Sequence, residues 1–512
     1  MGTQDANGNS RLSELSFWPR VREFAVPASM IETAAARRLT GDWAGACAAA
    51  GFDVDLDLRS VARDHGRETA RLVRDDLRKL APDLLRWHMP RIAPDGLLRP
   101  GLTLALAEYG RGEGGGGGRG GGGGRARDRP LCLVVRTAPA WADAGQRISL
   151  ALWSGARGGS GGGGGLGGGA CRHPHPYPYP YPHPRPNRRF RLDLHRHLWD
   201  ARRAGELRIR AGSGLLGHSD LPDLPDLNPE GPPGPDPDLS ATVPYGRRCA
   251  VGRWADEARM LLRAEGRDAG AVLVRLGGRH RLVLEVGGGG VAKSRTSSGK
   301  GRARALPVLP DAATWVLPDL ELLRAGAIDA DRLHPLVAEA LVPDRASRSS
   351  PVSQPSPSRS TAEAGQPCLV ECRGAVHRIG LVDGVLAPLD HDPAEVRREE
   401  LLAALTGTPL PCLQAIDEAH RRPACLPDVR ERLSHGDIRG ALAIVEGLLG
   451  PDAVLRDGAL RDELEAVARQ RVTYGLFRAG LTGPGPGRFR YDELERGRPR
   501  PDRARPRHAT LH

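Results

Sequence analysis

Hydrophobic residues recur at helical spacing near both ends of the chain and alternate with polar residues in its middle. Val73 and Leu77 belong to one such helical stripe, which predicts a helical N-terminal domain over residues 13–110. Within it, Ser29 and Glu32 have the spacing of a capping box that opens a helix. A second helical domain is predicted over residues 391–482.

The middle of the chain shows a mixed pattern of strands and helices. We expect an α/β central region over residues 131–342 and a β-hairpin unit over residues 367–390. The predicted fold class is therefore α+β, with helical regions flanking a mixed centre. Strands are expected at 131–136, 147–153, 189–194, 207–210, 271–276, 280–286, 368–372, 376–382 and 385–389, and helices at 254–265, 314–325 and 330–341.

Low-complexity segments interrupt this pattern. Glycine (67) and proline (44) account for 111 of the 512 residues. Poly-glycine loses much backbone entropy on ordering, and alternating proline favours an unpaired extended chain. We therefore predict long disordered loops or tails at 111–129, 155–187, 216–244, 287–305, 343–366 and 483–512.

Positive charge exceeds negative charge, with 74 Lys and Arg residues against 62 Asp and Glu residues and a net charge of +12. A basic chain attracts phosphate polymers without sequence specificity. The arginine-rich tail at 483–512 therefore makes weak nucleic-acid binding an alternative function. Lys79, Lys293 and Lys300 are the only lysines, which disfavours Schiff-base, P-loop and kinase-type chemistry.

Cysteine content and terminal sequence indicate a cytoplasmic protein. Eight cysteines in 512 residues lack the tight spacing of a disulfide-stapled secreted protein. The N-terminus shows no basic segment followed by an apolar segment, and no apolar run approaches membrane-spanning length. We expect neither a signal peptide nor contact with a membrane.

Two internal similarities stand out. The strand-turn-strand sequence at 273–282 is similar to that at 369–379, and a looser copy lies at 133–148. The sequence Arg38–Ala46 matches Arg432–Ala441 with one residue inserted. Its Gly-Asp step resembles the turn of a tetratricopeptide (TPR) hairpin, although no 34-residue array connects the two copies. The first similarity predicts one sheet or several similar small α/β units, and the second predicts helical hairpins at both ends of the chain.

Two groups of cysteine and histidine residues have ligand types that zinc accepts. The first lies in a glycine- and proline-rich tract without a rigid surrounding and consists of Cys171, His173, His175 and His183. In the second group, Cys368 and Cys372 would lie about 13 Å apart on a strand, too far to share an ion. The second group consists of Cys368, Cys372, His377, Cys412, His420 and Cys425. We therefore expect buried structural cysteines, no metal and no cofactor.

Catalytic motifs are weak. The glycines at 287–290 before Lys293 and Ser294 approach a phosphate-binding loop, but no amphipathic helix follows. The glycine run at 112–117 matches a dinucleotide pattern only through its composition. Two histidine groups lie near acids without a recognised motif: His391 beside Asp390 and Asp392, and His195 and His197 near Asp193 and Asp200.

The sequence therefore favours a non-catalytic protein-interaction or scaffold module with protein partners. The alternatives are a phosphate-polymer binder and a hydrolase whose site residues are scattered along the chain. The catalytic residues of such a hydrolase are unknown.

Overall fold

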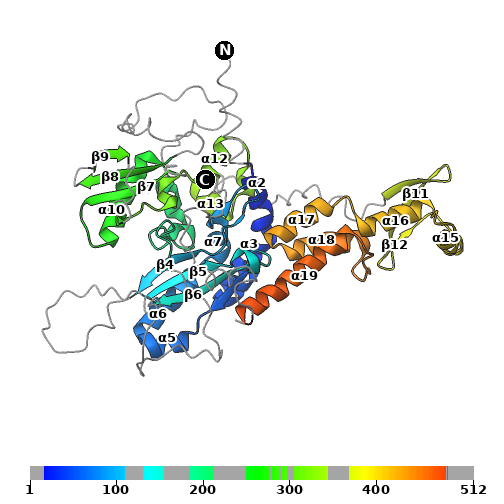
Figure 1. The fold of residues 1–512 in the computed structure, drawn as a ribbon, viewed down its shortest axis with the longest axis horizontal. Helices are drawn as coiled ribbons and strands as arrows, with labels where there is room; N and C mark the ends of the chain where they lie inside the picture. The colour runs from blue at the N-terminus through cyan, green and yellow to red at the C-terminus, as the bar shows by residue number, and fades with distance from the viewer. Residues whose placement is uncertain are drawn as a thin grey trace, which may run out of the picture. The chain divides into compact units, whose positions relative to one another are not determined.

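The computed structural model describes residues 16–109, 131–154, 185–211, 249–276, 280–287, 290–296, 305–343, 368–479 and 481. Small sheets and many helices alternate along these residues (Figure 1), which confirms the predicted α+β class. The chain divides into two compact units. Among the described residues, unit one extends to 343 without 142–146, and unit two comprises 142–146 and the residues from 368 onward.

Unit one contains a four-stranded sheet with the order β1-β6-β5-β4. β1 (Phe52–Asp55) runs parallel to β6 (Ile148–Ser154), and β5 (Leu131–Thr137) is antiparallel to both β6 and β4 (Thr103–Tyr109). β4 and β5 are almost continuously buried, as expected for strands that are covered on both faces. This sheet is the centre of unit one.

The helices of unit one share their core with this sheet. Val73 and Leu77 pack in the same cluster as Leu104 and Leu106, and this cluster extends along the chain from Phe17 to Leu341. The helices are α2 (Trp18–Arg20), α3 (Ala28–Leu39), α4 (Trp43–Ala49), α5 (Leu58–His65), α6 (Arg67–Lys79), α7 (Pro82–His88), α8 (Leu207–Arg210), α10 (Trp254–Ala264), α11 (Asp311–Thr314), α12 (Pro318–Arg324) and α13 (Pro335–Leu341).

The predicted helical domain over residues 13–110 is therefore not separate from the central region over residues 131–342. β4 and β5 are hydrogen-bonded neighbours, so the glycine run between them is an insertion within one sheet rather than a linker between domains. The region is also not purely helical, because it contains β1, β4 and the hairpin of β2 (Arg91–Ile92) and β3 (Leu97–Leu98). A short, continuously apolar strand gives no alternating pattern that would distinguish it from a helix.

A second, three-stranded sheet lies in the later part of unit one, with the order β7-β8-β9. α10 packs on one face of β7 (Gly270–Arg275) and β8 (Arg281–Gly287), and Trp254 and Trp315 are the largest buried side chains of this core. β9 (Gly290–Thr296) pairs with β8, so the coil that we predicted over residues 287–305 is wrong for residues 290–296. Lys293 thus lies within a strand and not in a phosphate-binding loop.

Several shorter predictions are also wrong. Residues 189–194 form turns with a single bridge from Arg191 to Ala105, and 207–210 form α8 instead of a strand. The helix expected at 314–325 begins only at Pro318, as α12. Thr314 is instead the last residue of the preceding helix α11. Pro27, and not Ser29, is the N-cap of α3, so the expected capping box does not form.

Unit two joins a three-stranded antiparallel sheet to five helices. β10 (Cys368–Cys372), β11 (Ala375–Val382) and β12 (Val385–Pro388) follow each other in space as in sequence. Cys372 and Ile379 of the sheet share a small core with Cys412 and Ile416 of α16, so the predicted boundary at residue 390 does not separate two domains. The helices are α15 (Pro393–Thr406), α16 (Pro411–Arg421), α17 (Leu426–His435), α18 (Ile438–Leu449) and α19 (Ala459–Arg478).

The similar sequences at the two ends form similar helix corners, one joining α3 to α4 and the other joining α17 to α18. Asp42 caps α4 by accepting a hydrogen bond of 2.8 Å from the Gly45 amide, and its carboxylate lies 3.1 Å from the Arg37 guanidinium. In the second corner, Asp437 accepts from the Gly440 amide at 3.0 Å and lies 2.7 Å from the guanidinium of Arg432.

A glycine with positive φ precedes each of these aspartates. φ is +80° at Gly41 and +88° at Gly436, values that side chains with a Cβ rarely adopt. The helical hairpins predicted for both ends are therefore confirmed.

In the described part of the chain, no helix has the length and apolar character that a membrane span requires.

A fully buried ion pair connects the start of unit one to α12. The guanidinium of Arg22 lies 2.7 Å from the carboxylate of Asp319, and the indole Nε1 of Trp87 donates a 3.0 Å hydrogen bond to the same carboxylate. An exposed ion pair of 3.1 Å joins Glu23, the residue after Arg22, to Arg332, which follows α12 in the chain. The two pairs differ mainly in their burial.

We predict that Asp319→Asn lowers the free energy of unfolding by about 3–5 kcal/mol, because it leaves Arg22 buried without an anion. Glu23→Gln should cost less than about 1 kcal/mol, since water solvates Arg332 when the pair is lost. Calorimetric unfolding of the full chain measures both variants. Equal effects of the two substitutions would contradict the importance that we give to the buried pair.

Candidate functional site

The histidines and acids at residues 193–200 lie in a buried polar region of unit one. Two short 3₁₀ turns, at 196–198 and 204–206, fold this segment tightly, and the Trp199 indole donates a 2.9 Å hydrogen bond to the Leu192 carbonyl. The side chains of His195, His197 and Asp200 are all buried. The sequence showed no motif that joins these residues, and the structure defines their partners.

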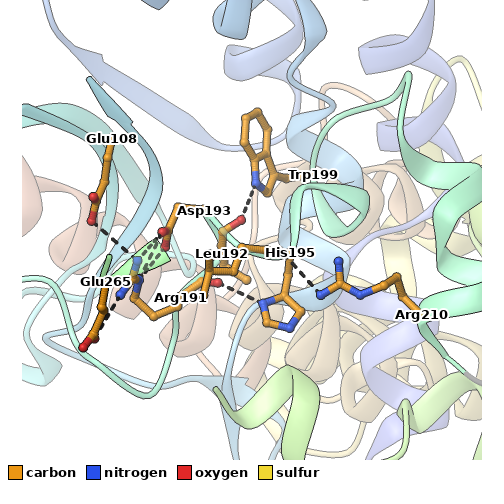
Figure 2. Close-up of polar contacts among 9 residues, drawn as sticks. Glu108, Arg191, Leu192, Asp193, His195, Trp199, Arg210 and Glu265 are labelled. Carbon is orange, nitrogen blue, oxygen red and sulfur yellow. Dashed lines mark hydrogen bonds and ion pairs between the residues drawn. The ribbon is translucent and has the colours of Figure 1, made fainter. Parts of the chain in front are cut away.

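Arg191 lies among three carboxylates (Figure 2). Its nearest partner is Asp193 at 2.7 Å, followed by Glu108 at 3.7 Å and Glu265 at 4.0 Å. Burial alone would lower the pKa of Arg191, but the hydrogen bonds that it donates to Asp193 and the charges of the three acids hold the pKa above its ordinary value. Asp193 is therefore committed to a structural ion pair.

His195 is held on both sides of its ring. Its Nδ1 lies 2.9 Å from the Arg191 carbonyl, as Figure 2 shows, and its Nε2 lies 3.2 Å from the Glu257 carboxylate. A general base must present a free nitrogen to its substrate. Because both nitrogens of His195 contact the protein, this geometry favours a structural role over a catalytic one.

Glu257 is the anion that neutralises this region. Arg210 binds it through two contacts of 2.7 Å, in the bidentate arrangement that suits a carboxylate. Burial raises the pKa of Glu257, but hydrogen bonds and charges from His195 and Arg210 outweigh that effect and lower the pKa to about 2. Glu257 is therefore ionised throughout the physiological pH range.

His197 and His88 are buried in their neutral form. Burial lowers the pKa of His88 to about 4 and lowers that of His197 well below its ordinary value, while nearby histidines and arginines act in the same direction. Asp200 lies 3.5 Å from the Arg196 guanidinium. Arg196 also pairs with Asp76, which accepts a 2.9 Å hydrogen bond from the Tyr109 hydroxyl.

The cysteine and histidine residues that the sequence grouped in the C-terminal region are only partly brought together. Cys372 and Cys412 lie close to each other and to His391, with their ligand atoms all within 4.8 Å of one another. Cys368 is exposed, which corrects the expectation that the cysteines of this group are all buried, and His420 and Cys425 lie outside the group. The glycine- and proline-rich group at 171–183 lies outside the described residues.

Sequence reasoning missed the contribution of His391 because it compared the cysteines with each other along one strand. Two features of the sequence could have indicated this group. His391 lies three residues after the end of β12, and Cys412 lies in the first turn of α16. The two aspartates beside His391 are used elsewhere, since Asp390 pairs with Arg378 at 2.7 Å and Asp392 caps α15. They are therefore not arranged as phosphohydrolase metal ligands.

The thiol of Cys412 is not activated as a nucleophile. A reactive cysteine needs a lowered pKa, which keeps a thiolate available near neutral pH. Burial and the neighbouring Cys372 instead raise the pKa of Cys412 to about 11.

No protein-family model matches this sequence, and comparisons with curated proteins and with solved structures gave no match. Functional inference therefore depends on the geometry of the described residues.

We predict that Glu257→Gln destabilises unit one by about 3 kcal/mol at neutral pH, because Arg210 and His195 lose their buried anion. The folded-state pKa is lowered to about 2, so the stabilisation is present above about pH 4.5 and is lost as the pH falls towards 2. The difference in thermal unfolding midpoint between variant and wild type should shrink over this interval.

The matched control is Glu265→Gln, which removes a more exposed carboxylate at 4.0 Å from Arg191. It should change the midpoint little at either pH. A Glu257→Gln variant as stable as wild type at pH 7 would show that the carboxylate does not stabilise this region.

Proposed function

We propose that this protein is a non-catalytic interaction module whose C-terminal unit binds a partner protein through helix α15. The observation that carries the proposal is that α15 extends over 14 residues, yet none of its side chains is buried. A helix of this length is marginally stable in water unless an apolar face packs against something. Leu401, Leu402 and Leu405 are exposed by 66%, 50% and 86%.

These three leucines form one patch on the helix. Leu401 and Leu405 are four residues apart, and Leu402 is three residues from Leu405, so their side chains are neighbours on the helix surface. Burying one leucine in an interface contributes about 1.5–3 kcal/mol. Three leucines on one helix face therefore provide the apolar anchors that helix-mediated recognition uses.

The sheet of unit two carries further exposed apolar side chains. One face packs on α16, while Leu369, Val376, Val382 and Val385 lie on the opposite face and are exposed. The pairing of Glu371 with Val376 and of Val382 with Val385 places these residues on one face. Glu371 and Arg378 lie on this face as well, so the exposed apolar side chains alternate with charged ones and do not form a continuous patch.

The charge of this region indicates the chemistry of the partner. Between Cys368 and Thr406 there are seven acidic residues and four arginines, whereas the whole chain has a net charge of +12. A region of opposite sign within a basic chain favours a partner with basic residues around an apolar surface. The proposed partner is therefore a different protein with an apolar surface bordered by lysine or arginine.

The alternatives have less support from the described residues. The arginine-rich tail on which nucleic-acid binding depends lies outside those residues, so this function stays a prediction. The hydrolase alternative needs a free acid or base, whereas His195 and Glu257 are engaged with each other and with neighbouring groups. A cytoplasmic location is part of the proposal.

The test uses the full chain with the photo-crosslinker p-benzoylphenylalanine at position 402, expressed in its native cell. Irradiation should give one defined adduct, and the crosslinked peptide of the partner should lie in a surface rich in lysine or arginine. Leu401→Glu combined with Leu405→Glu should reduce the adduct at least about 10-fold, because these two anchors lose their burial.

The matched control is Leu39→Glu, which changes an equally exposed leucine of α3 in unit one. It should leave the adduct unchanged. An adduct with a second copy of the chain, or adduct formation that survives the double substitution, would contradict the proposed interface.

A further inference from the structure

Cys372, His391 and Cys412 form a compact group of metal-binding residues in unit two, independent of α15's proposed interface. Their ligand atoms lie within 4.8 Å of one another, both cysteines are fully buried and the His391 side chain is only 5% exposed. In a tetrahedral zinc site, sulfur and nitrogen ligands are about 3.5–3.8 Å apart, which follows from bond lengths of about 2.0–2.3 Å. Shifts of about 1 Å would therefore bring these atoms around an ion.

The three residues come from three different elements. Cys372 ends β10, His391 lies between β12 and α15, and Cys412 is in the first turn of α16. A bound ion would connect the sheet to the starts of both helices. Structural zinc sites likewise join separate segments, although they use four protein ligands; here water would take the fourth position.

The two thiols are part of the local core that joins the sheet to α16. The buried cluster consists of five residues, namely Cys372, Ile379, Leu410, Cys412 and Ile416, and two of these are the cysteines. Val370, Leu386, Leu413 and Ala415 pack against this cluster and are partly buried. A metal held by the cysteines would add its binding free energy to this apolar packing.

The imidazoles provide an independent indication. His391 Nε2 and His377 Nδ1 are buried without a hydrogen-bond partner, which is costly for polar nitrogens. The ring of His377 stacks on that of His391, with centroids 4.2 Å apart and planes inclined by 13°. The stacking fixes the orientation of the His391 ring, and coordination would satisfy a nitrogen.

We propose that unit two binds one zinc ion through the thiolates of Cys372 and Cys412 and an imidazole nitrogen of His391. Two thiolates and one imidazole form a soft to borderline donor set that zinc accepts and that magnesium and calcium do not favour. A disulfide between the cysteines would account for the two sulfur atoms, but not for the histidine beside them.

The first test measures metal content and thiol protection in the full-length wild-type protein. Protein purified without chelators should contain one equivalent of zinc by elemental mass spectrometry. Cobalt(II) in place of zinc should give the visible bands of tetrahedral cobalt and the charge-transfer bands of thiolate ligation. Iodoacetamide should modify Cys368 at once, but Cys372 and Cys412 only after a zinc chelator is added.

The second test uses substitutions. Cys372→Ser, Cys412→Ser and His391→Ala should each weaken zinc binding by more than about 100-fold, measured by competition with a chromogenic chelator. Cys368→Ser is the matched control and should bind zinc like wild type, because this exposed cysteine lies outside the group. Alkylation of the wild type keeps the test valid if a ligand variant fails to fold.

Three results would overturn the proposal. The first is wild-type protein without zinc whose thiol reactivity does not change with a chelator. The second is protection of Cys372 and Cys412 that a reductant, and not a chelator, removes, which would show a disulfide. The third is zinc binding that survives all three ligand substitutions.

Discussion

Unit one depends on charges that are buried between segments distant in sequence. Asp319 is completely buried and accepts hydrogen bonds from Arg22 and Trp87, so α12 can only occupy its place when the N-terminal segment is folded beside it. Glu257 has a similar position between Arg210 and His195. An unpaired charge in such a place is strongly unfavourable, whereas the apolar core around it tolerates many arrangements. The buried ion pairs therefore restrict which assembly of the helices is acceptable.

The parts of the fold that could be predicted from sequence are those that local physics determines. The hairpin of β11 and β12 follows from alternating residues around Asp383 and Gly384, and Asp392 caps α15 where the sequence places an Asp-Pro step. The parts that could not be predicted depend on long-range pairing. β4 and β5 are neighbours although a glycine run separates them, and β9 forms from a glycine-rich sequence because β8 offers an unpaired edge.

The candidate sites show the same division. The sequence identified the residue types, such as His195 near Asp193 and the cysteines from Cys368 onward, because these stand out in the composition. It did not identify the partners that determine their chemistry. Glu257 lies far along the chain from His195, and Cys412 is 40 positions from Cys372. Only the folded structure shows that His195 contacts Glu257 and that the thiols of Cys372 and Cys412 lie close together.

The repeated helix corner has a consequence for how new helical surfaces can arise in such a chain. In both copies a glycine turns the backbone, an aspartate caps the next helix and an arginine one turn earlier neutralises that aspartate. All of these contacts lie within about ten consecutive residues, so local interactions alone favour the conformation of the corner. A short duplication of this kind could be inserted into unrelated surroundings and would still bend two helices together, which makes it a transferable building block for evolution and for protein design.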